Sequence, residues 1–101
     1  MKNKTVFVAC DTSNIQEIKK IISLTKTKKL KIIPKFGIQF FYSKQGRKFL
    51  ENIKSEFWLD LKINDIPQTA LSAIDSLKDL KKCKYITVHA NGGLNMLKAV
   101  K

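Results

Sequence analysis

The chain has 101 residues, 44% of them hydrophobic, and a formal net charge of +12 at pH 7. This length allows one small domain, and the hydrophobic content argues against a disordered chain. No apolar run approaches the roughly 18 residues of a membrane span, and the run near the N-terminus is too short for a signal peptide. We therefore expect a cytoplasmic domain without a membrane partner, in which Cys10 and Cys83 stay reduced.

The first predicted unit is a strand followed by an amphipathic helix. Residues 5–11, "TVFVACD", form a short apolar run rich in β-branched residues, and residues 12–26, "TSNIQEIKKIISLTK", carry isoleucines at helical spacing. Ser13 and Gln16 stand three residues apart at the start of this helix, which is the arrangement of a capping box. The sequence therefore predicts a helix that begins beside Ser13.

The second unit repeats the order of strand and helix. Residues 30–37, "LKIIPKFG", are the predicted strand, and residues 43–55, "SKQGRKFLENIKS", are the predicted helix. Pro34 lies inside the strand sequence, where a missing N–H removes a hydrogen bond from a buried ladder. We therefore expect Pro34 at the end of the strand or at a local irregularity.

Two more units complete the chain. Residues 56–65 and 84–90 are the predicted strands, and residues 67–81 and 92–101 are the predicted helices, the first of them with Pro67 in its opening turn. The apolar stripe of the helix after the third strand consists of Leu71, Ile74 and Leu77. The "NGG" run at residues 91–93 is interpreted as a tight turn.

The repeated rhythm predicts the fold class. Four consecutive strand–helix units require a parallel sheet, because parallel strands need a helical crossover. An open doubly wound sheet and a (β/α)8 barrel both fit this pattern. A complete barrel takes on the order of 250 residues, so four units correspond to half of one.

The third strand carries charge on one of its faces. Side chains alternate across a sheet, so Phe57, Leu59 and Leu61 are expected to pack under helices. Trp58, Asp60 and Lys62 then point to the other face.

Ionisable residues also follow the other strands. The carboxyl ends of parallel strands are where α/β proteins place ligands, and the side chains expected there are Asp11, Lys35, Asp60, Lys62, Asp65 and His89. Ordinary ion pairs are one interpretation. The alternation of acid and base favours catalysis, because a lysine held between carboxylates remains charged and can protonate a developing carbanion. A lone histidine without a second histidine or a CxxC pair predicts no metal site.

These residues carry a resemblance to a known family. "VACD" closes the first strand, "KFG" the second and "VHANGG" the fourth, while "DLKINDIPQT" spans the third. In this order and spacing, they resemble the N-terminal half of orotidine 5'-monophosphate decarboxylases across residues 1–101. The longest run fits the family signature D-x-K-x-x-D-I-P-x-T at every fixed position. The resemblance implies four of the eight units of a TIM barrel, a half-barrel.

The resemblance also implies roles for individual residues. Lys62 would protonate C6 of the pyrimidine after carbon dioxide leaves, and Asp60 would crowd the substrate carboxylate. Lys35 would order the charges and contact the ribose, and Asp11 would hold a ribose hydroxyl. Asp65 would reach into the neighbouring site of a homodimer and complete a Lys-Asp-Lys-Asp alternation there, with Ile66 and Thr69 close by as substrate-binding residues. The implied enzyme converts orotidine 5'-monophosphate to uridine 5'-monophosphate in pyrimidine biosynthesis, with no metal or organic cofactor.

Three questions stay open at this point. The phosphate-binding loops of the family are not in this sequence, so the chain alone is expected to be a poor or inactive enzyme, and its two free sheet edges could pair with a second copy. A magnesium-dependent hexulose-phosphate synthase or ketogulonate-phosphate decarboxylase shares D-x-K-x-x-D but generally not the "IPxT" continuation. A non-catalytic basic fragment that binds nucleic acid or a partner is the third alternative. Only Arg47 among the twenty basic residues is arginine, which weakens the nucleic-acid interpretation.

Overall fold

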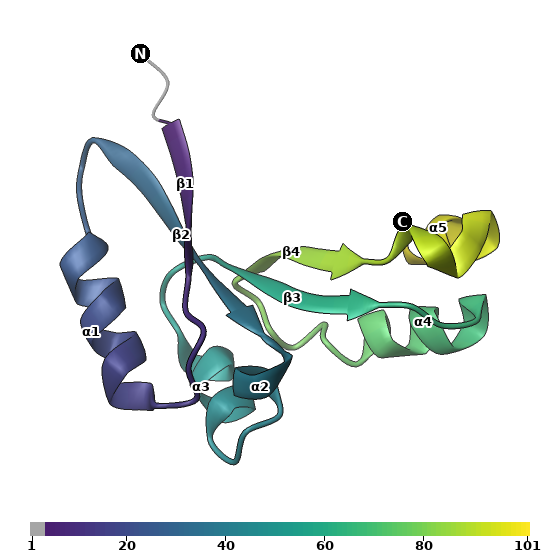
Figure 1. Cartoon of the computed structure of the whole chain (residues 1–101), viewed down its shortest axis with the longest axis horizontal. Helices are drawn as coiled ribbons and strands as arrows, with labels where there is room; N and C mark the ends of the chain where they lie inside the picture. Colours follow the sequence, from purple (N-terminus) through teal and green to yellow (C-terminus); the bar gives the residue numbers. More distant parts are fainter. Residues whose placement is uncertain (1–3) are drawn as a thin grey trace.

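A computed structural model describes residues 4–101 and shows one four-stranded parallel sheet in the order β1-β2-β3-β4 (Figure 1). The elements in chain order are β1 (Lys4–Ala9), α1 (Ile15–Thr25), β2 (Leu30–Gly37), α2 (Ile38–Phe41), α3 (Gly46–Asn52), β3 (Phe57–Ile63), α4 (Pro67–Asp75), β4 (Cys83–Val88), the 3₁₀ turn η1 (Ala90–Gly92) and α5 (Gly93–Val100). The predicted order of strands and helices is confirmed, and α2 is a further short helix that the sequence pattern did not predict. Within the described residues, no helix has the length and apolar character needed to cross a membrane.

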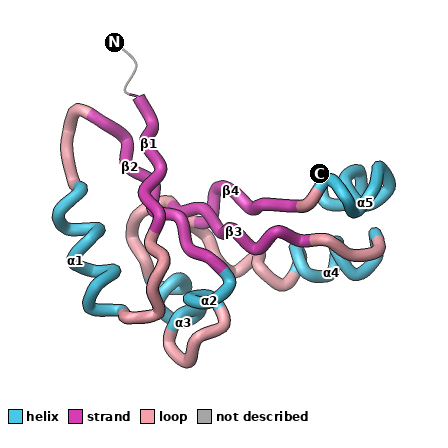
Figure 2. The backbone as a smooth tube through the Cα atoms, in the orientation of Figure 1, coloured by secondary structure: helices cyan, strands magenta, loops and turns pink. Residues whose placement is uncertain are grey.

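The sheet is strongly twisted. In Figure 2 the paired β1 and β2 run across the direction of the paired β3 and β4. The β1–β2 ladder extends over six residue pairs, from Lys4 with Leu30 to Ala9 with Lys35, whereas β2 and β3 share only three pairs. Such twist between neighbouring parallel strands is the geometry from which a barrel wall is built.

The start of α1 differs from the prediction. The helix begins at Ile15, and its N-cap is Asn14 rather than Ser13. The Asn14 side-chain oxygen accepts hydrogen bonds from the backbone N–H groups of Gln16 at 2.9 Å and Glu17 at 3.2 Å. Asn14 satisfies two N–H groups that have no partner inside the helix, so the helix starts one residue after it.

Pro34 also departs from its predicted place. It lies inside β2, is buried, and pairs in register with Val8 of β1. The pairing of β2 with β3 begins only at Lys35. The missing N–H of Pro34 therefore lies just before that ladder starts and removes no hydrogen bond from it.

Helix α4 is shorter than predicted. It ends at Asp75, and the following residues turn through tight bonds such as Leu77 N–H to the Ile74 carbonyl at 3.0 Å. Leu71 was expected in the buried stripe but is 38% exposed, while the neighbouring Ala70 is completely buried. Leu77 is buried and Ile74 is half-buried, as predicted, so Leu71 is the one member of the predicted stripe that lies exposed.

The helices cover one face of the sheet and create the core. Phe57 and Leu59 point to this face as predicted and are fully buried. Phe36 lies at the centre, with ring centroids 5.1 Å from Phe40 and 5.9 Å from Phe57. Ile18 of α1 and Leu50 of α3 complete this phenylalanine core, as the predicted apolar stripes of those helices require.

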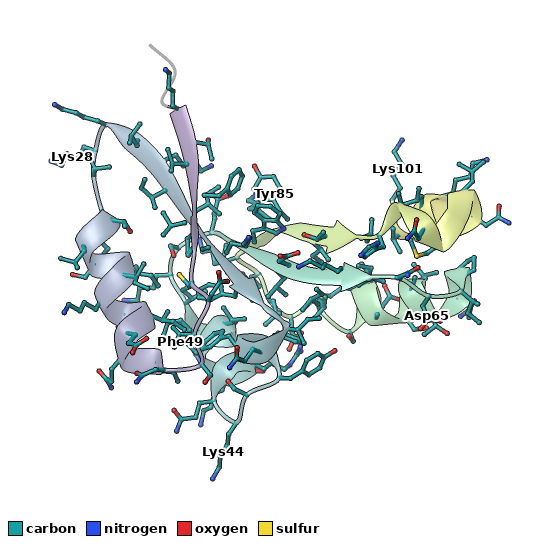
Figure 3. All side chains as sticks on the ribbon, viewed as in Figure 1. Lys28, Lys44, Phe49, Asp65, Tyr85 and Lys101 are labelled. Atoms are coloured by element: carbon teal, nitrogen blue, oxygen red, sulfur yellow. The ribbon has the colours of Figure 1, made fainter. Side chains whose placement is uncertain are left out.

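Among residues 4–101, no helix lies over the opposite face of the sheet. Phe7, Trp58 and Tyr85 from three strands meet there, with centroids of 5.0 Å between Phe7 and Trp58 and 5.3 Å between Phe7 and Tyr85. Figure 3 shows Tyr85 on this side and Phe49 on the side of the helices. We call this surface, defined by Phe7, Trp58 and Tyr85, the open face.

Candidate active site

Three of the predicted charged residues come together at the carboxyl ends of β2 and β3. Lys62 Nζ lies 2.7 Å from Asp60 Oδ2 and donates a hydrogen bond to it, and Lys35 Nζ lies 3.8 Å from the same oxygen. The Asp60 side chain is only 14% exposed, whereas that of Lys62 is 55% exposed. Within this chain Asp60 therefore lies between two lysines. The second carboxylate expected beside Lys62, the Asp65 of a neighbouring subunit, stays a prediction.

The surroundings of Asp60 keep it ionised. The hydrogen bond from Lys62 is the main cause that lowers the pKa of Asp60 below its usual value of 3.8, opposed by partial burial. A hydrogen bond from Thr87 and the charges of both lysines lower this pKa further. Trp58 positions Thr87 in turn, because its Nε1–H donates to Thr87 Oγ1 at 2.8 Å.

Thr87 is a residue that the sequence argument did not select. It stands two positions after Tyr85 and two before His89 in the fourth strand, so all three share one face by alternation. That periodicity is the signal which identifies it. Lys35 is further held by the Trp58 ring, whose centroid lies 5.3 Å from the ammonium nitrogen.

The backbone of β3 changes course at Lys62. Lys62 has φ of 51°, in the left-handed region that non-glycine residues rarely adopt. The ladder with β4 passes from Leu59 opposite Ile86 to Ile63 opposite Val88, so four steps along β3 face two along β4. This irregularity is a bulge, and bulges at strand ends change the direction of a side chain. The strained backbone is thus the local cause of the Lys62 position.

Asp11 lies two residues after the end of β1 and is exposed. Its neighbour Cys10 is fully buried, and its backbone N–H bonds the Lys35 carbonyl at 2.9 Å. Burial raises the pKa of the Cys10 thiol to about 11, and the Asp11 charge adds to this effect. Cys10 and Cys83 are both free cysteines, as predicted. The Cys10 thiol is therefore packed in the core, and the Cys10 backbone N–H links the end of β1 to β2 beside Asp11.

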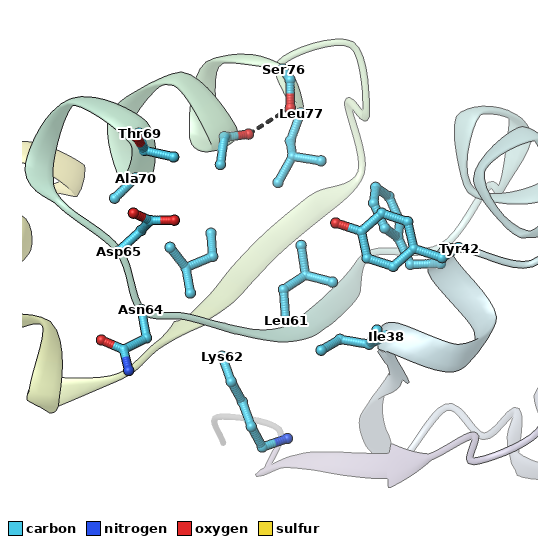
Figure 4. A pocket seen from close by; sticks show the side chains of 13 residues that line it. Ile38, Tyr42, Leu61, Lys62, Asn64, Asp65, Thr69, Ala70, Ser76 and Leu77 are labelled. Carbon is cyan, nitrogen blue, oxygen red and sulfur yellow. Dashed lines mark hydrogen bonds between the residues drawn. The ribbon is translucent and has the colours of Figure 1, made fainter.

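Asp65 does not join the cluster of Lys35, Asp60 and Lys62. In Figure 4 it points to the opposite side of the strand end from Lys62, toward Thr69 of α4. Its Oδ1 accepts a hydrogen bond from the Ile66 N–H at 2.8 Å, and within residues 4–101 it has no ion pair. Asp65 and Thr69 line a pocket of about 270 Å³ between α2 and α4, whereas Ile66 is exposed.

The fourth strand end shows the predicted turn. Residues 90–92 form η1, and Gly93 takes φ of 87°, a conformation that favours glycine. His89 precedes the turn, is exposed, and donates its backbone N–H to the Ile63 carbonyl at 2.7 Å. The contribution of His89 that the structure shows is therefore made by its main chain, which joins the ends of β3 and β4.

The chain matches a known protein family along nearly its whole length. Residues 4–101 match the sequence pattern described as "Orotidine 5'-phosphate decarboxylase / HUMPS family". The chain belongs to this family. Orotidine 5'-phosphate decarboxylases of Streptococcus pyogenes serotypes M3 and M5 are each 38% identical to it over 104 residues, covering 100% of this chain and 44% of the relative.

A solved structure gives the same result for the fold. The crystal structure of orotidine 5'-phosphate decarboxylase from Lactobacillus acidophilus matches with a TM-score of 0.82 and 31% identity, over 98% of this chain and 44% of that one. The chain is thus an α/β half-barrel whose four parallel strands alternate with helices, as predicted. It spans less than half the length of the relatives that it matches.

Proposed function

We propose that this chain provides the decarboxylating centre of an orotidine 5'-monophosphate decarboxylase, as the N-terminal half of its barrel. The observation that supports this most directly is the cluster of Lys35, Asp60 and Lys62 at the carboxyl ends of β2 and β3. These residues lie in a family member whose relatives carry the name of that activity. The "IPxT" continuation at Ile66, Pro67 and Thr69 favours this reaction over the magnesium-dependent sugar-phosphate reactions of the superfamily.

The proposed reaction uses the cluster in two successive steps, loss of carbon dioxide and protonation of C6. The bond between C6 of the pyrimidine and the carboxylate breaks, carbon dioxide leaves, and the electron pair stays on C6. The Lys62 ammonium then donates a proton to C6 and is recharged from water. Asp60 stays ionised because of its lowered pKa, so it repels the substrate carboxylate more than the less charged transition state.

The remaining predicted residues position the substrate in this proposal. Lys35 orders Asp60 and contacts the ribose, and Asp11 binds a ribose hydroxyl. Asp65, Ile66 and Thr69 serve the site of a second subunit in a homodimer, in line with Asp65 pointing away from its own chain's cluster. The proposed enzyme acts in pyrimidine biosynthesis in the cytoplasm, where free cysteines persist.

Phosphate binding is assigned to the part of the fold outside this chain. Remote binding groups hold the reacting atoms in place during catalysis, so the purified 101-residue chain should turn over its substrate poorly or not at all. Release of carbon dioxide from carboxyl-labelled orotidine 5'-monophosphate measures this. A rate close to that of the Streptococcus pyogenes relative would contradict the assignment of phosphate binding to the part of the fold outside this chain.

A chimera tests the role of Lys62. This chain would be joined to the part of the Streptococcus pyogenes relative that it does not match, and the chimera is expected to release carbon dioxide with a chelator present. Lys62→Ala should lower kcat about 10²–10⁴-fold, the range of a lost general acid. The control Lys78→Ala removes an exposed lysine whose partner is Asp75 at 3.1 Å, and should leave kcat unchanged. Equal rates for the chimera and its Lys62→Ala variant would refute the assignment, and dependence on magnesium would favour a sugar-phosphate enzyme.

A further inference from the structure

A groove on the helix side of the molecule lies between α1 and α3. Its volume is about 500 Å³, which is within the size range of small-molecule pockets. The residues that line it from α1 share one face of that helix, because they stand three or four positions apart: Lys19, Ile22, Ser23 and Lys26. The facing wall comes from α3 and the segment after it, where Phe49 and Ile53 are half-buried. The groove therefore has apolar side chains on both walls.

The groove is separate from the candidate active site and from the free edges of the sheet. Within residues 4–101, the strands with a neighbour on one side only are β1 and β4, whereas α1 leads into β2 and α3 leads into β3. Lys26 and Ser55 precede the amino ends of β2 and β3. Lys35 and Lys62 lie toward the carboxyl ends of the same two strands. A ligand in the groove would therefore not contact the charged cluster around Asp60.

The charges around the groove are positive. Lys19, Lys26 and Lys54 line it and are exposed, and no acidic residue of the described chain is among its lining residues. The acidic residues nearest in sequence to its α3 wall, Glu51 and Glu56, form ion pairs with other basic residues. Within residues 4–101, none of the three lysines has an ion pair. Three ammonium groups beside apolar side chains favour an anionic ligand that also has an apolar part.

Ser55 adds a hydroxyl group that lacks a partner. Its Oγ is buried and has no hydrogen-bond partner within residues 4–101. Ser55 lines the groove and also a smaller cavity of about 60 Å³ between α1 and the sheet, and both hollows include Ile22 and Lys26. A buried polar atom without a partner costs free energy, and native proteins contain few of them. A ligand oxygen that accepts a hydrogen bond from Ser55 would remove this cost.

We propose that the groove between α1 and α3 binds an amphiphilic anion, a small molecule with a carboxylate or phosphate group and an apolar body. The anionic group pairs with Lys26 and Lys54 and accepts a hydrogen bond from Ser55 Oγ, while the apolar body covers Phe49 and Ile53. The aliphatic stem of a lysine can pack along such a body while its ammonium group stays in water. This site is independent of the proposed decarboxylation, and its test does not require an active enzyme.

Calorimetric titration of the chain with octyl phosphate and with octanoate tests the site, and the tighter of the two identifies the anionic group that it takes. The tighter probe should bind at least about 10-fold more strongly than inorganic phosphate or octanol, because each of these lacks one half of the recognised chemistry. Equal affinity for inorganic phosphate, equal affinity for octanol, or no binding of either probe would overturn the proposal.

Paired lysine variants separate the groove from the general positive charge. Lys26→Ala combined with Lys54→Ala should weaken binding of the tighter probe at least about 10-fold. The matched control combines Lys20→Ala with Lys48→Ala, which removes the same charge from exposed positions of α1 and α3 outside the groove. This control should leave the Kd unchanged. Equal weakening by the two pairs would show diffuse attraction and refute the site.

Ser55→Ala separates ligand binding from folding. Without ligand, this variant should have a urea midpoint at least as high as that of the natural chain, because the change removes a buried hydroxyl without a partner. It should nevertheless weaken binding of the tighter probe about 10-fold, the effect of losing a hydrogen bond to a charged group. Ser23→Ala, which removes an exposed hydroxyl from the α1 wall, should leave the Kd unchanged. An unchanged Kd for Ser55→Ala would contradict the assigned hydrogen bond.

Discussion

The two faces of this sheet contain similar residues in different environments. On the helix side, Phe36 contacts Phe40 and Phe57, and each of the three residues is at most 1% exposed. On the open face, Phe7 and Tyr85 contact Trp58 at comparable centroid distances but remain nearly half exposed. Distances between aromatic rings alone therefore do not distinguish a buried core from a partly exposed aromatic cluster. The difference is that α1, α2 and α3 cover the first face and no described element covers the second.

The comparison also separates stability from chemistry. The helix side is entirely apolar at its centre, since none of the fully buried residues is polar or charged. The charged cluster of Lys35, Asp60 and Lys62 belongs to the strand positions that face away from the helices, beside Trp58. Hence the half-barrel holds these three charged residues in place with a core that does not include them.

The largest expected loss of stability concerns the buried core on the helix side of the sheet. Phe36→Ala should lower the free energy of unfolding by about 3–5 kcal/mol, because it leaves a cavity among buried rings. Such a loss approaches the whole stability of a small domain. Phe7→Ala on the open face should cost less than about 1.5 kcal/mol, since its ring is partly hydrated already. Urea denaturation measures both, and equal losses would erase the distinction between the two faces.

The junction of α2 and α3 comes next. A Cβ on Gly46 would overlap the Phe40 carbonyl oxygen, so Gly46→Ala must displace the backbone that carries the core phenylalanines. We expect a loss of about 1–3 kcal/mol in unfolding free energy. Gly37→Ala is the matched control, because no atom lies within 4 Å of its Cβ position. If the control proves the more damaging change in urea denaturation, the packing at Gly46 has been misjudged.

The cap of α1 should have a smaller effect on the covered face. Asn14→Ala removes the acceptor for two backbone N–H groups and should cost about 1 kcal/mol. Ser13→Ala should change stability by less than about 0.5 kcal/mol, because Ser13 lies outside the helix. Thermal unfolding followed by circular dichroism compares the two. A larger loss of stability for Ser13→Ala than for Asn14→Ala would support the capping box that the sequence predicted.

The smallest effect is expected from Asp60, because its main partner Lys62 is largely exposed. The pKa of Asp60 is lowered by folding, so its contribution is present above pH 3.8 and lost as the pH falls through the lower folded value. The stability difference between the natural chain and Asp60→Asn should therefore be greatest near neutral pH and shrink below pH 3.8. Urea denaturation midpoints of both chains over this pH range measure the difference. A stability difference that grows on acidification would contradict a lowered pKa of Asp60 in the folded chain.

Periodicity predicted the strands and the helices that connect them, but neither the short α2 nor the ends of the elements. Alternation in "FWLDLK" placed Phe57 and Leu59 on the covered face and Trp58 with Asp60 on the other, and the structure confirms the buried pair. The N-cap at Asn14 was missed because Ser13 and Asn14 are both good caps and only the backbone geometry selects one. Pro34 was misplaced because the sequence does not show where the short β2–β3 ladder begins.

The sequence by itself determined the strand–helix order, the family resemblance and the positions of Asp60 and Lys62 at a strand end. These depend on local spacing, which the chain carries in its residue pattern. Only the tertiary structure decided the distances that bring Lys35 and Lys62 to one oxygen of Asp60, and that the open face stays uncovered. Each of these depends on the bulge at Lys62 or on sheet twist, which arise from pairing between distant strands.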